Sequence, residues 1–379
     1  MKRLIAVLAL AFLFPASSSC DVDAVVQREM KRLNIPALSI AVLRNGAIVF
    51  SKAYGLADVE NGTLATPATR FRTASVAKSI TAAAVMKLVE GGRIKLDEPI
   101  QTYCSAFPQK DAKVTVRHLL THTSGLRHYQ KQGESRGMEH FLTVRDSLAL
   151  FKDDPLLFGP GTKFGYSTYG FSLLGCAIEG VTGMQFDEYL RDHVFAPAGM
   201  RHTGADHHFL IIPGRARPYS VLSEEDFRQL PPEVKRRVQA GLLINAWFHD
   251  TSMKRPGGGL LTTAEDLVRF AWAFQKGDLV SGETVSAMWS VQRLNDGTEI
   301  ITPWGPLGIG WFVSKAEKPR RITSSGGQIG GRASINLYPD DGLVFAIMTN
   351  LTNADISAIE GELRTHLGLP ESQPRPVRE

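Results

Sequence analysis

Two apolar segments near the start of the chain predict a β-hairpin. Residues 37–43 and 47–54 are rich in apolar and β-branched side chains, and residues 44–46 between them contain Asn-Gly. Asn-Gly between two such segments is the strongest short-range signal for a hairpin. Residues 333–338 and 343–350 repeat the pattern near the other end of the chain. We therefore expect two strand pairs, one from each half of the sequence.

Apolar residues at helical spacing predict helices outside and between these strands. Residues 21–33 and about 354–366 show this spacing, which places the apolar side chains on one helix face. The stretch from about 95 to 300 is also mainly helical in its pattern. Together these elements predict an α/β fold of the α+β type: an antiparallel sheet built from both termini, flanked by helices, with a large, mainly helical insertion. Residues 20–370 would form this domain, and the polar, Pro-rich residues 371–379 a flexible tail.

The first 19 residues have the pattern of a signal peptide. Lys2 and Arg3 precede an unbroken apolar run from Leu4 to Phe14, and small residues follow it. This run is shorter than the roughly 20 residues that a transmembrane helix needs. We therefore expect an exported protein, periplasmic or extracellular, that lacks residues 1–19 when mature. A lipid anchor at Cys20 stays open as an alternative.

Composition and charge exclude several classes of protein. Of the 379 residues, 43% are hydrophobic, which allows a sizeable core and argues against a disordered chain. The formal net charge is +5, and the basic residues are spread along the chain. The one dense basic run, residues 235–237, fits a solvated helix face better than a nucleic-acid patch. We expect no nucleic-acid partner.

Cysteine and histidine spacing gives no sign of a metal site. Beyond Cys20 the cysteines are Cys104 and Cys176. Export would permit a disulfide between them, but the apolar surroundings of Cys176 favour buried free thiols. The histidines that lie close in sequence lack the spacing of a metal motif; they are His193, His202, His207 and His208. Residues 257–259 are glycines without the lysine of a phosphate-binding loop, so we expect no metal and no cofactor.

Ser75 and Lys78 stand at the start of a predicted helix that runs to Glu90 and stops at Gly91. Residues three apart lie on one helix face, so the two side chains would point the same way. A neutral lysine can take the proton of a serine hydroxyl, and a helix N-terminus favours developing negative charge. The same spacing also suits an N-cap serine followed by a solvated lysine. The pair alone does not decide between these interpretations.

Five segments, in the same order along the chain, resemble motifs of the serine β-lactamase and penicillin-binding-protein superfamily, in its class C branch. They are residues 71–81, 119–126, 160–175, 257–267 and Ser324-Ser325-Gly326-Gly327. The Tyr-Ser-Thr sequence at residues 166–168 is most similar to the mitochondrial serine β-lactamase-like branch. The resemblance covers about residues 35–350, and it implies the antiparallel-sheet fold and an active-site serine.

The resemblance implies a role for each motif residue. Ser75 would be the nucleophile, and Lys78 and Tyr166 would share the general-base and general-acid work. The backbone N–H groups of Ser75 and Gly327 would hold the oxyanion. His122, in a loop beside the site, would support it without transferring protons.

Residues 160–175 correspond to the family's second motif and residues 324–327 to its third, and both depart from the family pattern. Ser325 and Gly326 keep positions that meet the substrate, but Ser324 replaces a lysine or histidine, so the positive charge near a substrate carboxylate is lost. Arg332 would restore that charge if it pointed inward. Thr168 replaces an asparagine and lacks its amide fork. Losing one charge-assisted hydrogen bond costs about 1.5–3 kcal/mol, so we expect common β-lactams to be poor substrates.

These residues predict an exported serine hydrolase that forms an acyl-enzyme on Ser75 with a small-molecule or peptide substrate, cleaving an amide, peptide or β-lactam-like bond. A short-chain carboxylesterase is one alternative, because apolar side chains such as Phe164, Trp247 and Trp304 would suit esters. A penicillin-binding or filament-forming scaffold with little turnover is another, because the third motif is altered. The charged stretch 219–255 is expected to border the site as a lid.

Overall fold

The structure is a computed structural model that describes residues 16–130, 134, 137–314 and 319–369. The apolar run of the predicted signal peptide, the side chain of Cys20 and the predicted tail lie outside what the structure describes. Within the described ranges, no helix combines the length and the apolar character that crossing a membrane requires.

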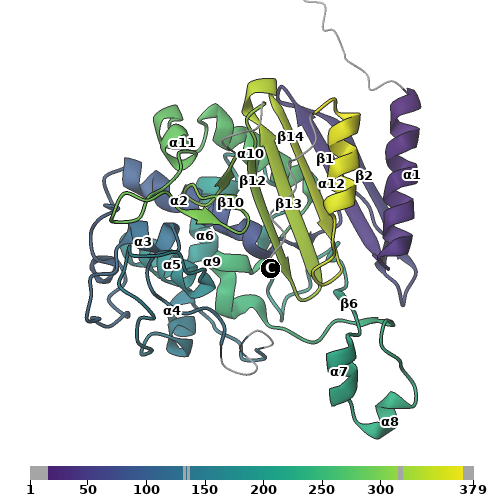
Figure 1. Ribbon diagram of the computed structural model, residues 1–379, viewed down its shortest axis with the longest axis horizontal. Helices are drawn as coiled ribbons and strands as arrows, with labels where there is room; N and C mark the ends of the chain where they lie inside the picture. Colours follow the sequence, from purple (N-terminus) through teal and green to yellow (C-terminus); the bar gives the residue numbers. More distant parts are fainter. Residues whose placement is uncertain (1–15, 131–133, 135–136, 315–318, 370–379) are drawn as a thin grey trace, which may run out of the picture.

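A seven-stranded antiparallel sheet forms the centre of the fold (Figure 1). Its strand order is β11-β12-β13-β14-β1-β2-β3. The bounds are β1 (Ala37–Arg44), β2 (Ala47–Asp58), β3 (Thr63–Leu64), β11 (Phe312–Val313), β12 (Ile322–Gln328), β13 (Gly331–Tyr338) and β14 (Leu343–Thr349). β1 pairs with β14 from Leu38 to Arg44, so strands from opposite ends of the chain lie side by side. The predicted sheet built from both termini is confirmed.

Both predicted hairpins are present. β1 and β2 are joined at Asn45 and Gly46, whose φ angles are 50° and 88°. Two successive positive φ angles are what a type I′ turn requires, and Asn-Gly adopts them readily. β13 and β14 are joined by a short turn, Pro339–Asp341, and by Gly342 with a φ of 60°. The local turn chemistry therefore fixes where these strands end.

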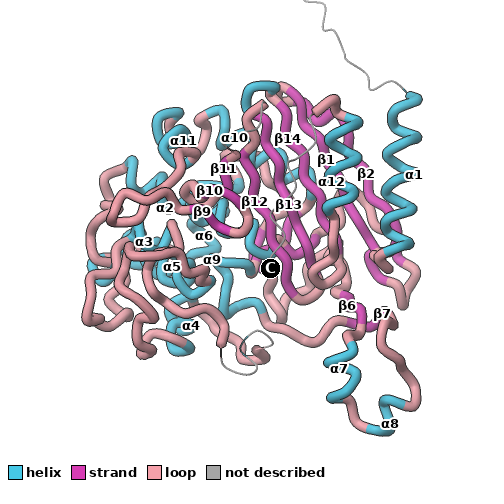
Figure 2. The backbone as a smooth tube through the Cα atoms, viewed as in Figure 1, coloured by secondary structure: helices cyan, strands magenta, loops and turns pink. Residues whose placement is uncertain are grey.

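Helices fill the predicted insertion and flank the sheet (Figures 1 and 2). They are α1 (Ala16–Arg32), α2 (Ala77–Glu90), α3 (Val116–Leu120), α4 (Val144–Ser147), α5 (Thr168–Thr182), α6 (Phe186–Leu190), α7 (Glu224–Gln229), α8 (Pro232–Lys235), α9 (Arg255–Gly258), α10 (Ala264–Lys276), α11 (Gly282–Met288) and α12 (Ser357–His366). Short strands accompany them: β4 (Phe71–Arg72), β5 (Gly204–Ala205), β6 (Tyr219–Val221), β7 (Leu243–Asn245), β8 (Leu260–Thr262), β9 (Ile301–Thr302) and β10 (Gly305–Pro306). The mainly helical insertion is confirmed.

Both faces of the central sheet are covered. On β1, Ile40 and Val42 pack in the cluster that contains α1 and α12, whereas Ala41 and Leu43 belong to the larger core that contains α2 and α10. This alternation follows from the two-residue period of a strand. Because each face meets helices, β1 is apolar almost throughout.

A two-stranded ribbon, β6 with β7, carries α7 and α8 away from the rest of the molecule (Figure 2). Both helices are fully described, and neither has a buried residue. The basic run 235–237 lies at the end of α8, where its side chains are exposed or half-buried. This position matches a solvated helix face.

Cys104 and Cys176 form a disulfide, so the expectation of free thiols is wrong. Both residues are buried as predicted. However, α5 brings Cys176 to a Cα–Cα distance of 5.5 Å from Cys104, which a disulfide can bridge. The apolar run around Cys176 indicated burial, but the proximity arises from packing between segments that are distant in sequence.

Reduction of this disulfide should destabilise the protein. The bond joins residues 72 positions apart, and such crosslinks typically contribute about 2–4 kcal/mol, chiefly by restricting the unfolded chain. Thermal unfolding should therefore show a lower melting temperature with dithiothreitol than without it. The double variant Cys104→Ala/Cys176→Ala should melt at the lower temperature and no longer respond to the reductant. A reductant effect that persisted in this variant would contradict the prediction.

Candidate active site

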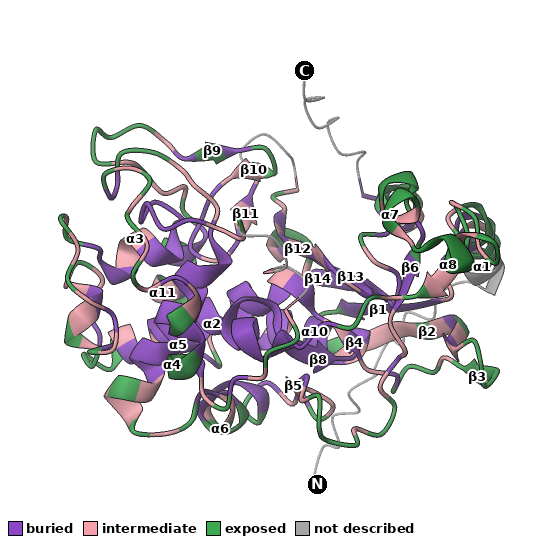
Figure 3. Cartoon of the chain, turned by 90° about the horizontal axis from the view of Figure 1, so that it is seen from below, coloured by how far each residue is buried: buried purple, intermediate pink, exposed green. Residues whose placement is uncertain are grey.

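Ser75 lies in a tight turn at the start of α2. Residues Ala74–Val76 form a single 3₁₀ turn, and α2 continues from Ala77. Ala74 has a φ of 47°, in the left-handed region that residues with a side chain rarely occupy. Such backbone strain clusters at functional sites. α2 is almost entirely buried (Figure 3), so the core behind it fixes the turn that carries Ser75.

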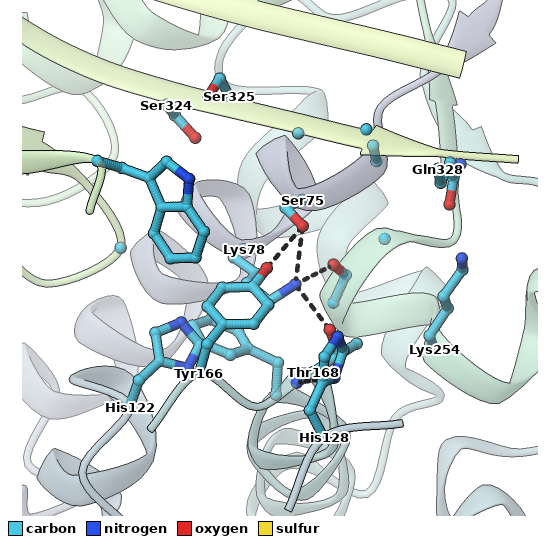
Figure 4. Close-up of a pocket in the computed structure, with 18 of the residues that line it drawn as sticks. Ser75, Lys78, His122, His128, Tyr166, Thr168, Lys254, Ser324, Ser325 and Gln328 are labelled. Atoms are coloured by element: carbon cyan, nitrogen blue, oxygen red, sulfur yellow. Dashed lines mark hydrogen bonds between the residues drawn. The ribbon is translucent and has the colours of Figure 1, made fainter. Parts of the chain in front are cut away.

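The three side chains that the sequence assigned to the chemistry meet at one point (Figure 4). The hydroxyl oxygens of Ser75 and Tyr166 are 2.7 Å apart. The ammonium of Lys78 donates a 3.2 Å hydrogen bond to Ser75 Oγ and lies 5.0 Å from the centre of the Tyr166 ring. The serine hydroxyl therefore has two groups within hydrogen-bond reach that can exchange its proton.

Lys78 is held by acceptors from three segments of the chain. Besides Ser75 Oγ, its ammonium donates to Thr168 Oγ1 at 3.2 Å and to the carbonyl of Gly257 at 2.6 Å. Lys78 is 5% exposed, and an ammonium has three donors and no acceptor. Each N–H therefore has a partner. Thr168, which replaces an asparagine, keeps the one hydrogen bond that the lysine needs.

β12 runs along the turn that carries Ser75, with no room for a side chain between them. A Cβ atom on Gly326 would lie 2.2 Å from Ser75 N and 2.8 Å from Ser75 Cβ, well inside van der Waals contact. Glycine at this position therefore allows the close approach of the strand to Ser75. Ser325 and Gly327, the neighbours of Gly326, line the same cavity as Ser75. The strand thus brings both predicted oxyanion donors, the N–H groups of Ser75 and Gly327, to this cavity.

Ser324 links two elements where the family pattern has a cation. Its hydroxyl lies 2.7 Å from that of Ser79 on α2, and Ser324 is buried. Arg332 pairs with Gly327 across β12 and β13, whereas Ser324 pairs with Ile335. Arg332 lines the cavity, but three residues farther along β12. It therefore does not take the place of the missing third-motif cation.

Two neutral histidines pack against Tyr166. The ring centres of His122 and His128 lie 4.5 and 5.3 Å from that of Tyr166. Burial and the charge of Lys78 hold the pKa of His122 well below its ordinary value and lower the pKa of His128 to about 4. Each Nδ1 atom accepts a 3.3 Å hydrogen bond from the backbone N–H of one of the two residues after Tyr166. Both rings therefore orient Tyr166 in their neutral form. His128 belongs to a segment, residues 127–129, that resembles the mitochondrial branch, but the sequence assigned it no role.

These residues open into a cavity of about 610 Å³. Trp304 and Phe312 form an aromatic wall, and the Trp304 ring centre lies 5.4 Å from that of Tyr166. Trp304 was expected there. Phe164 does not line the cavity, but it packs against Trp304, with ring centres 6.4 Å apart, and so belongs to the same aromatic wall. Trp247 is not among the described residues that line the cavity, so that expectation is wrong.

Lys254 and Gln328 also line the cavity and were not predicted. They lie on the other side of Ser75 from Ser324 and Ser325 (Figure 4). Of the stretch 219–255, which was expected to border the site, Lys254 is the one described residue in the lining, because the ribbon with α7 and α8 projects elsewhere. Neither residue belongs to a local motif; both reach the cavity because distant segments pack around Ser75.

Acidic side chains and metal ligands do not gather at this site. The described residues that line the cavity include no aspartate or glutamate. Across the described ranges, no three histidine, cysteine, aspartate or glutamate side chains are grouped as a metal ion would need. The site offers a serine hydroxyl in contact with a tyrosine hydroxyl and a lysine ammonium, beside a cavity with positive charge.

The family model described as Beta-lactamase matches residues 22–367. The chain belongs to the β-lactamase family. It is similar to the serine beta-lactamase-like protein LACTB, mitochondrial, of Homo sapiens, with 26% identity over 91% of this chain and 80% of that protein. It is also similar to the esterase EstB of Burkholderia gladioli, with 28% identity over 76% of this chain and 79% of that protein.

Solved structures of β-lactamase-like proteins share the fold. The D-amino acid amidase from Ochrobactrum anthropi SV3 superposes with a TM-score of 0.78 at 22% identity, covering 92% of this chain and 99% of that one. A penicillin binding protein from Bacillus halodurans gives a TM-score of 0.73 at 24% identity, covering 91% and 98%. With the family match, the protein is a serine hydrolase of the β-lactamase-related type.

Replacing Gly326 with alanine should disable the site without unfolding the protein. The new Cβ would lie 2.2 Å from Ser75 N, so the strand or the turn must shift, and a misplacement of about 1 Å costs about 10²-fold in rate. We expect kcat/KM for a p-nitrophenyl ester to fall at least about 100-fold, with cooperative melting retained. Gly204→Ala is the matched control, because no heavy atom beyond its chain neighbours lies within 4 Å of its added Cβ. Full activity of Gly326→Ala would refute this role of the glycine.

Proposed function

We propose that this protein is an exported hydrolase that forms an acyl-enzyme on Ser75 and cleaves amide or peptide bonds. The observation that carries the proposal is the contact of Ser75 Oγ with both Tyr166 and Lys78, at 2.7 and 3.2 Å. A serine alcohol is a weak nucleophile until a neighbouring group takes its proton, and both neighbours here are placed to do so.

The proposed reaction has two steps, acylation of Ser75 and hydrolysis of the acyl-enzyme, and Tyr166 and Lys78 act in both. In this mechanism Tyr166 acts as a phenolate beside the ammonium of Lys78, and it takes the proton of Ser75 as Oγ attacks the substrate carbonyl carbon. The N–H groups of Ser75 and Gly327 bind the oxyanion. Tyr166 returns the proton to the leaving amine, and a water molecule activated by the same pair then releases the acyl group.

A short-chain carboxylesterase is the second candidate. Trp304 lies between Tyr166 and Phe312, with ring centres 5.4 and 5.9 Å away, so the leaving group would meet an apolar wall. Such a wall suits an aryl or alkyl alcohol. The similarity to the esterase EstB supports this candidate.

Export is supported by two independent features. Residues 1–19 have the pattern of a signal peptide, and the Cys104–Cys176 disulfide suits an oxidising compartment. A scaffold with little turnover has less support, because Ser75, Lys78 and Tyr166 are all present and in contact.

A variant panel on p-nitrophenyl acetate and D-alanyl-D-alanine peptides tests the proposal. Ser75→Ala should abolish turnover of every acyl substrate and labelling by a fluorophosphonate. Tyr166→Phe and Lys78→Met should each lower kcat/KM by about 10²–10⁴, the usual contribution of a general acid–base group. Ser290→Ala, a change of an exposed serine, is the control. Activity that survived Ser75→Ala would refute the proposal, and the preferred substrate would decide between the amidase and the esterase.

β-Lactams should be turned over slowly. Ser324 supplies a hydroxyl, bound to Ser79, where the family pattern has a cation for the substrate carboxylate. The loss of one charge-assisted bond lowers rate or affinity by about one to two orders of magnitude. Steady-state kinetics with a chromogenic cephalosporin should give a kcat/KM below about 10⁴ M⁻¹s⁻¹, the lower edge of typical enzymes. A value of about 10⁶ M⁻¹s⁻¹ would show that the cation is dispensable.

A further inference from the structure

The charged side chains that line the cavity all carry the same sign. Lys78, Lys254 and Arg332 line it, and the described lining includes no carboxylate. Lys78 is already satisfied by three acceptors around Ser75. Lys254 lies on the side of Ser75 away from Ser324 (Figure 4), and Arg332 pairs with Gly327, three residues along β12 from Ser324.

Lys254 is a buried ammonium that lacks an acceptor. It is the last residue of a 3₁₀ turn, Thr251–Lys254, directly before α9, and it is 6% exposed. No hydrogen bond or ion pair joins its ammonium to another residue that the structure describes. The nearby carboxylate of Asp206 is engaged by Arg72 and Arg215, at 2.8 and 3.7 Å. Burying an unpaired charge is costly, so this position is suited to an anion that arrives from the cavity.

The electrostatics of Lys254 agree with this geometry. Burial and the charges of Arg72 and Lys78 lower the pKa of Lys254 to about 7, while Asp206 opposes the shift. A carboxylate beside the ammonium would restore its charged form, because an opposite charge within a few ångströms favours ionisation.

Gln328 lines the same cavity as Lys254, and Figure 4 shows both on the same side of Ser75. It is the last residue of β12 and is 8% exposed, yet neither its amide nitrogen nor its amide oxygen has a partner. An amide nitrogen offers two donors. Buried polar groups are nearly always paired in native proteins, so the unpaired amide indicates a second contact for a ligand.

The direction of the leaving group shows which part of the substrate would reach these residues. Tyr166, the proposed proton donor to the leaving group, packs against Trp304. Trp304 packs against Phe312, which pairs with Thr323, the residue before Ser324. The leaving group would therefore lie at the Ser324 end of β12. The acyl part must extend to the opposite end, where Lys254 and Gln328 lie.

We propose that Lys254 and Gln328 form a subsite for a carboxylate on the acyl part of the substrate. The proposal rests on acyl transfer at Ser75. It defines the substrate class as esters or amides whose acyl group ends in, or carries, a carboxylate. Lys254 supplies the charge, and the Gln328 amide supplies a neutral donor.

The test compares acyl groups that differ only in charge. The probes are 4-methylumbelliferyl esters of glutaric, adipic and pimelic acid that keep a free ω-carboxylate, each beside its isosteric, neutral ω-carboxamide. At one chain length or more, kcat/KM should be at least about tenfold higher for the carboxylate, as expected of a charge-assisted hydrogen bond. Lys254→Met should bring this ratio close to one. Lys254→Arg should keep it above one, and Gln328→Leu should lower it by a smaller factor. Lys276→Met, on α10, is the matched control and should keep the wild-type ratio.

A binding measurement separates this proposal from the proposed function. Ser75→Ala, which retains the subsite, is titrated calorimetrically with adipamic acid and with neutral adipamide. We expect tighter binding of the acid, and loss of the difference in Ser75→Ala/Lys254→Met. Turnover of the esters without a charge preference would overturn the subsite and leave the hydrolase intact. Absence of all turnover would refute the hydrolase, and the titration would then decide on the subsite alone: equal binding of acid and amide overturns it.

Discussion

The buried ammonium of Lys78 is the constraint on which the site depends. A charge with almost no exposure is tolerated only when every donor is satisfied, and the three acceptors come from the Ser75 turn, from the start of α5 and from α9. These segments are far apart in sequence, so satisfying one side chain requires that they pack together. The same packing places Tyr166, two residues before Thr168, against Ser75 Oγ. The packing that satisfies Lys78 therefore also brings together the contacts of Ser75, the proposed nucleophile.

The second constraint is steric, and it comes from the sheet. Gly326 lets β12 approach Ser75 so closely that an alanine would collide with the backbone nitrogen of the serine. β12 in turn is held by β13, whose partner β14 pairs with β1 near the N-terminus. The sheet built from both ends of the chain thus positions part of the site. It fixes one wall of the cavity, while the helical insertion supplies Tyr166 and Thr168 on the other.

Features encoded locally were the ones that could be predicted. Asn45-Gly46 fixes a turn whose φ angles the residues themselves prefer, and the three-residue spacing of Ser75 and Lys78 holds in the 3₁₀ turn as it would in a helix. Features that depend on distant packing could not be read this way. The apolar sequence around Cys176 indicates burial, but Cys104 approaches it only after α5 has packed. Lys254 and Gln328 have ordinary sequence contexts, and their unpaired polar groups appear only once the cavity is closed around them.

The positions of the cavity's cations give an explanation for Ser324, which stands where the family's third motif has a cation. In the family pattern the cation stands at the position of Ser324, near the leaving-group side. Here a hydroxyl pair with Ser79 fills that position, while Lys254 and Arg332 put positive charge at the other end of β12. A charge selects the part of the substrate that it can reach. Under the proposed subsite, moving the charge along the strand would leave the contacts of Ser75 intact and would shift the preference from an anionic leaving group to an anionic acyl group. The departure at Ser324 therefore fits the proposed change of substrate, because Ser75, Lys78 and Tyr166 remain in contact.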